Sequence, residues 1–119
     1  MINLEYTDIF DDNKIKKIQF SKHLIKTPYK EKSLFAILVD GKSMEPVINH
    51  KAVIIADLSN KKLEDSSIYL VYYENKMWVK KYDLLNKIFI SINPDFSHLV
   101  YKEEDIHLVA KVILTFTTF

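Results

Sequence analysis

Six short stretches of the chain are rich in β-branched and aromatic residues, and polar residues separate each stretch from the next. Stretches of this length and composition are typical of β-strands. The pattern therefore predicts a mainly β fold of about six or seven strands, arranged in an antiparallel or mixed sheet. The predicted strands cover residues 34–39, 52–56, 67–73, 76–82, 87–92 and 107–115.

Two links between these strands are short enough for hairpins. Only Glu74 and Asn75 separate the third strand from the fourth, and residues 83–86 separate the fourth from the fifth. Links of this length join antiparallel strands that pair directly. We therefore expect the strand over residues 76–82 to lie between its two sequence neighbours.

The first 32 residues have a different character, because they are charged and show no sustained pattern. At most a short helix is expected over residues 21–26, and Pro28 would end it. We predict an irregular N-terminal arm over residues 1–32 and a single folded domain over residues 33–119.

The composition narrows the class of protein further. A chain of 119 residues, 48% of them hydrophobic, fits one folded domain. The longest apolar run, residues 34–39, is far shorter than the roughly 20 residues of a membrane-spanning helix, and no apolar leader opens the chain. Cysteine is absent and the four histidines are scattered, so we expect neither a disulfide nor a metal or other cofactor. These features favour a cytoplasmic protein.

The charge balance argues against direct binding of nucleic acid. Seventeen basic residues offset sixteen acidic ones, which leaves a net charge of +1 and no large basic surplus. The first 32 residues also show no helical period and are too few for the three helices of a helix-turn-helix domain.

The only glycine of the chain, Gly41, lies two residues before a candidate nucleophile, Ser43. A sole glycine is expected where the backbone needs unusual freedom, here a sharp turn that presents the serine. A serine hydroxyl is a poor nucleophile unless a base takes its proton. The sequence assigns no histidine to that role, since His23, His50, His98 and His107 follow no common pattern.

A lysine can act as the base if burial favours its neutral form. In an extended strand, alternation places Trp78, Lys80 and Tyr82 on one face, so the Lys80 amine would emerge between two aromatic rings. Lys81 faces the other way, beside apolar residues, and is a fair competitor. The pattern also permits both lysines to extend to solvent.

These residues together resemble a known family. Residues 41–46 resemble the Gly-x-Ser-Met-x-Pro signature of the LexA-type S24 peptidases, and residues 52–57 resemble the strand that follows it. Residues 78–82 are similar to the segment that carries the family's catalytic lysine. Residues 93–96 and 109–113 resemble its late loop and final strand, so that the resemblance covers about residues 33–114.

The resemblance implies roles for individual residues. Ser43 matches the nucleophile and Lys80 the general base, while the backbone N–H groups of Lys42 and Ser43 would hold the oxyanion. The residues expected to shape the turn or pack beside the nucleophile are Gly41, Met44, Glu45 and Pro46.

Two departures from the family's pattern qualify the implied function. Without a helix-turn-helix, the organisation is similar to a UmuD-like protein, to the isolated C-terminal domain of a repressor, or to a fragment of a longer regulator. The arm also contains neither the Ala-Gly nor the Cys-Gly bond at which family members cut themselves, so self-cleavage at the usual bond is excluded in this chain. Either the substrate segment lies upstream in a longer native protein, or another bond or another molecule is cut, or the Ser-Lys pair is retained without proteolysis. A peptidase would act on a regulatory segment in cis or in trans.

Three functions remain open from the sequence. The first is a Ser-Lys peptidase domain of a transcriptional or SOS-response regulator. The second is a non-catalytic dimerisation or effector module of a repressor, and the third is an unrelated β-domain that binds protein or ligand. The apolar C-terminal stretch, residues 106–119, favours pairing with a second copy, as the resemblance also implies, or else folds back over its own core.

Overall fold

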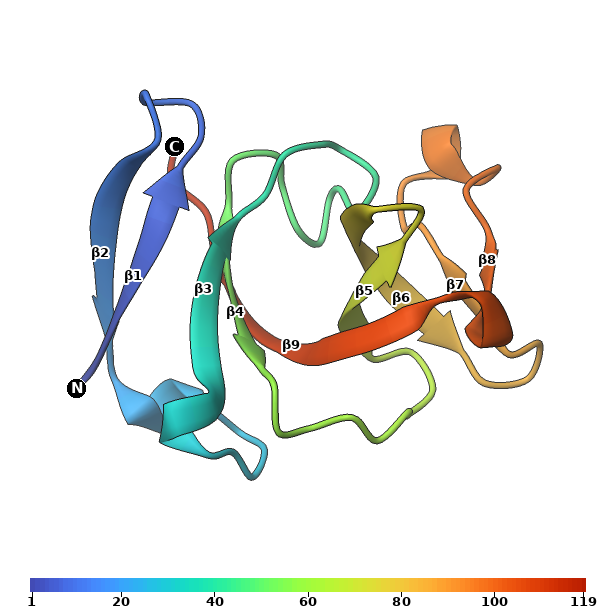
Figure 1. The fold of residues 1–119 in the computed structure, drawn as a ribbon, viewed down its shortest axis with the longest axis horizontal. Coiled ribbons are helices and arrows are strands. Elements are labelled where there is room, and N and C mark those ends of the chain that lie inside the picture. The colour runs from blue at the N-terminus through green and yellow to red at the C-terminus, as the bar shows by residue number, and fades with distance from the viewer.

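The computed structural model describes residues 1–119, which form two antiparallel β-sheets (Figure 1). The strands are β1 (Ile2–Asp8), β2 (Lys14–Phe20), β3 (Leu34–Leu38), β4 (Val53–Asp57), β5 (Ile68–Tyr73), β6 (Lys76–Asp83), β7 (Ile88–Ile90), β8 (Tyr101–Lys102) and β9 (His107–Phe116). The larger sheet has the order β3-β4-β9-β5-β6-β7-β8, and the smaller one consists of β1 and β2. The predicted mainly β fold is confirmed.

Four short 3-10 helices lie in the links between strands. They are η1 (Lys22–Leu24), η2 (Glu31–Ser33), η3 (Pro94–Phe96) and η4 (Glu103–Asp105). The first of them corresponds to the short helix expected over residues 21–26. It begins where the Ser21 hydroxyl accepts a hydrogen bond from the His23 N–H, as a helix cap does.

The middle of the sheet follows the predicted hairpins. Strand β6 pairs with β5 on one side and with β7 on the other, both antiparallel. Glu74 and Asn75, in the link between β5 and β6, both have positive φ, as a tight hairpin turn requires. Lys80 therefore lies on an interior strand, paired with Tyr69 of β5.

Strand β9 joins the two halves of the large sheet. It pairs with β4 and with β5, and its register shifts in both pairings. Such bulges increase the local twist of a strand, and Figure 1 shows β9 running across the molecule from β8 to the β3-β4 edge.

The N-terminal arm differs from the prediction, because residues 2–20 form a β-hairpin and are not irregular. The alternation of apolar and polar residues along β1 is the signal of a half-buried strand, and residues Asp12 and Asn13 in the link take positive φ. The hairpin packs its buried Ile2 and Phe20 against the β3-β4 edge of the large sheet. It is part of the folded body, as its place beside β3 in Figure 1 shows.

Three buried clusters hold the fold together. One lies under the hairpin, and another fills the space around Tyr69, Tyr82 and Phe89. The central cluster contains Met44 and Ile48, from the link between β3 and β4, together with residues of the sheet. The link that carries Ser43 is thus anchored directly in the core.

The helical segments are all short. No helix of the structure has the length and apolar character needed to cross a membrane.

Candidate active site

Ser43 lies in the turn that follows β3. Gly41 has a φ of +129°, a conformation that residues with a side chain rarely adopt, although a Cβ at this position would meet open space. The backbone angle, and not crowding, therefore selects glycine here. Two hydrogen bonds close the base of the turn: the Val39 N–H donates to the Ala52 carbonyl at 2.8 Å, and the Lys51 N–H donates to the Val39 carbonyl at 2.8 Å.

The residues after Ser43 fix the turn to the protein interior. Met44 and Ile48 are 2% and 1% exposed, so their side chains act as anchors in the central cluster. The Glu45 carboxylate accepts a hydrogen bond from the His50 N–H at 3.1 Å, and the peptide bond between Glu45 and Pro46 is cis.

The segment that follows β7 holds the turn from the other side. The N–H groups of Ile92 and Asn93 both donate to the Ser43 carbonyl, at 3.1 and 2.9 Å. The side-chain amide of Asn93 donates to the Lys42 carbonyl at 2.9 Å. The carbonyl groups of Lys42 and Ser43 are thereby fixed by residues that lie more than forty positions later in the chain.

Lys80 reaches Ser43 from the interior strand β6. Its side chain is 0% exposed, and its Nζ lies 3.3 Å from Ser43 Oγ and 2.9 Å from Ser91 Oγ. The rings of Trp78 and Tyr101 lie 5.4 and 5.8 Å from the amine. No carboxylate lies within salt-bridge distance of the amine. The amine therefore lies between two hydroxyl groups and two aromatic rings, without a counter-charge.

This environment changes the acidity of the amine. Burial disfavours the charged form and lowers the pKa of Lys80 from 10.5 to about 8. Near neutral pH an appreciable fraction of Lys80 is then uncharged and able to accept a proton.

The structure distinguishes between the two candidate lysines. Lys81 is partly exposed, on the strand position next to Lys80, and only Lys80 hydrogen-bonds to Ser43. The aromatic surroundings differ from the expectation, because the second ring beside Lys80 belongs to Tyr101 of β8 and not to Tyr82. The Tyr82 hydroxyl instead donates a hydrogen bond to the Glu103 carboxylate.

The amides expected to hold an oxyanion lie beside the nucleophile. The N–H groups of Lys42 and Ser43 make no hydrogen bond within the chain. The carbonyl groups of the same two residues are held in place by hydrogen bonds from Ile92 and Asn93. Their availability is compatible with binding a negatively charged oxygen near Ser43.

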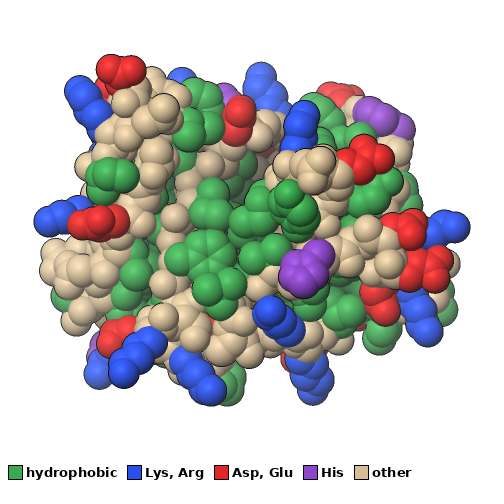
Figure 2. Space-filling model, viewed as in Figure 1, with side chains coloured by type: hydrophobic (Ala, Val, Ile, Leu, Met, Phe, Trp, Pro, Cys, Tyr) green, Lys and Arg blue, Asp and Glu red, His purple; other side chains and the backbone are tan.

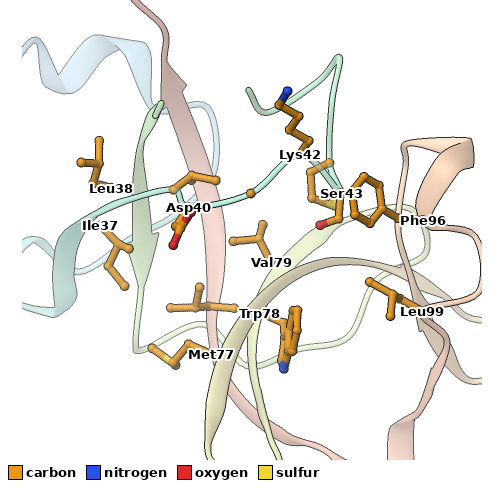
Figure 3. A pocket seen from close by; sticks show the side chains of 14 residues that line it. Ile37, Leu38, Asp40, Lys42, Ser43, Met77, Trp78, Val79, Phe96 and Leu99 are labelled. Atoms are coloured by element: carbon orange, nitrogen blue, oxygen red, sulfur yellow. The ribbon is translucent and has the colours of Figure 1, made fainter. Parts of the chain in front are cut away.

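Ser43 opens onto a cavity of about 290 Å³ (Figure 3). Its walls come from the end of β3, the Ser43 turn, β5, the start of β6, and η3 with the segment that follows it. In Figure 3 the Ser43 hydroxyl faces into this space, whereas the Lys42 side chain extends away from it. The apolar side chains that line it include Ile37, Leu38, Met77, Trp78, Phe96 and Leu99. Such a lining suits an extended segment with apolar side chains better than a charged small molecule.

Several residues of the site carried no recognisable signal in the sequence. Ser91 follows β7 directly and Tyr101 lies in β8, and both reach Lys80. Asn93 lies in a stretch that the sequence marks only by its resemblance to the family's late loop. His50 lies beside the turn, where its Nδ1 accepts a hydrogen bond from the Gly41 N–H at 2.8 Å. Among the histidines, none bonds to Ser43, and no group of three or more metal-binding side chains is present.

Comparison with known proteins identifies the family. The model of the family described as Peptidase S24-like matches residues 4–113, which include most of the hairpin and most of the large sheet. A comparison with curated proteins gives no match.

Proposed function

Because the chain belongs to the Peptidase S24-like family, we propose that it is a peptidase domain in which Ser43 is the nucleophile and Lys80 the general base. The observation that carries the proposal is the 3.3 Å separation of Lys80 Nζ and Ser43 Oγ, with the lysine fully buried. Because its pKa is lowered to about 8, part of the Lys80 population is neutral near physiological pH, and no other basic side chain bonds to Ser43.

The reaction proceeds in two steps. In the first, Lys80 takes the Ser43 proton as Oγ forms a bond to the peptide carbonyl carbon, and the N–H groups of Lys42 and Ser43 bind the resulting oxyanion. Protonated Lys80 then gives its proton to the leaving amine nitrogen, and the carbon–nitrogen bond breaks. In the second step, Lys80 takes a proton from water, which attacks the acyl-enzyme, and Ser43 Oγ regains a proton.

The substrate in this proposal is a regulatory peptide segment that enters the apolar cavity beside Ser43. Met77 and the end of β3 both line this cavity, so an extended segment that enters it would contact both. The segment belongs to a transcriptional or SOS-response regulator and is presented in cis or in trans. The usual Ala-Gly and Cys-Gly bonds are absent from residues 1–119, so the scissile bond is of another type or lies outside these residues, in the same polypeptide or in another.

The test uses a fluorophosphonate probe and intact-mass detection at mildly alkaline pH. Ser43 Oγ forms a bond to phosphorus, fluoride leaves, and the serine proton passes to Lys80. We expect a single adduct on the wild-type chain and none on S43A or K80M. K81M is the matched control, because it removes the neighbouring lysine from the same strand and should label at the wild-type rate. An adduct that persists in S43A, or equal labelling in K80M and K81M, would contradict the assignment.

A pool of synthetic peptides then tests the peptidase activity itself. Cleavage of any peptide should require both Ser43 and Lys80, and the products should show which side chains the apolar cavity accepts. Labelling without cleavage of any peptide, or of any longer regulator that contains this domain, would favour the alternative function, a non-catalytic dimerisation or effector module.

A second copy of the chain is the partner proposed in either case, bound through the C-terminal region. Phe116 packs on Phe20 with ring centroids 5.5 Å apart, so the end of β9 covers the chain's own core, whereas Phe119 is exposed. Hydrophobic side chains nevertheless gather over the middle of the face that β9 crosses (Figure 2). Size-exclusion chromatography with light scattering decides between the states, and a monomer at micromolar concentration would rule out the dimer.

A further inference from the structure

His50 is the side chain that connects the N-terminal hairpin to the nucleophile turn. On one side its Nδ1 accepts the hydrogen bond from the Gly41 N–H, at 2.8 Å. On the other side its ring meets the ring of Phe10 edge-on, with centroids 5.2 Å apart and planes at 77°. Phe10 lies in the link between β1 and β2, at the tip of the hairpin.

The hydrogen bond to Gly41 falls at the point where the turn needs support. Gly41 has the unusual φ of +129° and lies two residues before Ser43, and glycine is the residue that least restricts its own backbone. A backbone with this freedom keeps one conformation only if other contacts fix it. The bond from the Gly41 N–H to His50 fixes that amide directly.

His50 also closes the turn through its own backbone. Its N–H donates to the Glu45 carboxylate at 3.1 Å, so one residue contacts the chain both before and after Ser43. Because Nδ1 accepts a proton donor, the ring must be neutral with its own proton on Nε2. The charged groups around the ring are the Asp40 carboxylate, 4.0 Å from Nδ1, the Glu45 carboxylate, and the Lys51 amine, which lies 5.0 Å from the Phe10 ring centroid.

The hairpin tip holds the imidazole from outside. The His50 side chain is 28% exposed, and the Phe10 ring covers part of it. The tip is itself braced, because the Phe10 N–H donates to the Asp8 carboxylate at 2.9 Å and Lys16 pairs with Asp8 and Asp11. A chain of direct contacts thus runs from the hairpin through Phe10 and His50 to the backbone before Ser43.

From these contacts we infer that neutral His50 is a positioning residue for Ser43, held in place by Phe10 at the hairpin tip. This role rests on the proposed peptidase function. His50 touches neither Ser43 nor Lys80 and acts through the Gly41 amide. The inference gives the N-terminal hairpin a part in the site, since its tip supports the nucleophile turn.

The sole glycine of the chain makes the inference directly measurable. A protein labelled with ¹⁵N-glycine gives one backbone amide signal, that of Gly41. H50L keeps an apolar side chain but removes the acceptor, whereas H50N keeps an oxygen close to the position of Nδ1. We expect hydrogen exchange of the Gly41 amide to be about tenfold faster in H50L and close to the wild-type rate in H50N.

Labelling of Ser43 by the fluorophosphonate probe gives the second readout. Loss of one hydrogen bond that fixes the turn should lower the labelling rate of H50L about fivefold to tenfold, with recovery in H50N. F10A should lower the rate by a smaller factor. I9A is its matched control, because Ile9 is 48% exposed at the same tip and has no aromatic ring to pack against His50. Thermal melting of each variant separates this effect from unfolding.

The outcomes distinguish the inference from the proposed function. Faster Gly41 exchange and slower labelling in H50L, both reversed in H50N, support it. An unchanged exchange rate of the Gly41 amide in H50L overturns the inference. A faster exchange rate with an unchanged rate of Ser43 labelling overturns it as well. If the wild-type chain is not labelled at all, the proposed function fails, and Gly41 exchange alone decides whether His50 holds the turn.

Discussion

Replacing Lys80 with methionine should abolish activity and at the same time stabilise the fold at neutral pH. The Lys80 side chain is fully buried without a counter-charge, and its pKa falls from 10.5 to about 8 because burial disfavours the charged amine. One pKa unit corresponds to about 1.4 kcal/mol, so charging this amine in the folded state costs about 3 kcal/mol more than in the unfolded chain. Methionine has a similar length and no charge, so K80M should be more stable than wild type by up to about 3 kcal/mol at pH 7.

The pH dependence of that difference carries the test. Lys80 releases its proton near pH 8 in the folded state and near pH 10.5 in the unfolded state, so between these values the unfolded chain binds more protons. The free energy of unfolding of the wild type therefore rises with pH across this window relative to K80M. The stability of K80M relative to wild type should be constant below about pH 8 and should fall by about 3 kcal/mol between about pH 8 and pH 10.5. Titration of other groups cancels, because both proteins contain them.

The measurement is urea denaturation at a series of pH values, followed by fluorescence of the sole tryptophan. The lost hydrogen bonds to Ser43 and Ser91 lower the advantage of K80M by about 1 kcal/mol each or less, since both serines are partly exposed and can bond to water. K81M, at the partly exposed neighbouring position, should show no comparable change. A difference between K80M and wild type that stays constant from pH 7 to pH 10.5 would refute the reasoning.

Three further results are expected. The rate of Ser43 labelling should rise about tenfold for each pH unit below about pH 8 and then level off, because the neutral amine of Lys80 is the base; a rate independent of pH in the probe assay would exclude that role. S91A should lower the labelling rate about fivefold to tenfold, because Ser91 Oγ holds Lys80 Nζ at 2.9 Å, and S91T should restore it by returning the hydroxyl. K87G should raise the free energy of unfolding by about 0.5 to 1 kcal/mol in urea titrations, because Lys87 has a φ of 54°, which is strained for a residue with a side chain and relaxed for glycine. An unchanged free energy of unfolding would contradict this account.

The strands of the large sheet were largely predictable from the sequence, but the hairpin was not. Each strand predicted after residue 33 is present, and the short links around β6 gave its neighbours correctly. In the first 32 residues, charges scattered through the stretch hide the strand pattern. Only every second residue of β1 faces the core, so a weak alternation was the entire signal. Strand β8 has two residues and offered no pattern to find.

The candidate site was predictable only where its residues lie close together in the sequence. Alternation placed Lys80 with Trp78 on one face of β6, and the resemblance to the S24 peptidases paired Lys80 with Ser43. The short link after β6 predicts that β7 returns beside it, but nothing in the sequence indicates that β8 pairs with β7, or that the hydroxyl of Ser91 and the ring of Tyr101 face Lys80. The expectation that Tyr82 lies beside the amine is wrong, because the ring of Tyr101 takes that place and the Tyr82 hydroxyl bonds to Glu103.

The energetics of Lys80 also favour the peptidase proposal over a non-catalytic module. An interior strand of a dimerisation domain gains stability when an apolar side chain fills such a position, and a buried uncompensated amine lowers it by about 3 kcal/mol at neutral pH. That amount is a large part of the 5 to 15 kcal/mol by which a typical domain is stable. A lysine that is to act as a base near pH 7 needs this burial, because solvent exposure would return its pKa towards the ordinary value of 10.5 and leave almost none of it uncharged. The same burial that weakens the fold is therefore what would allow Lys80 to accept the Ser43 proton, and the pH dependence of K80M measures both effects at once.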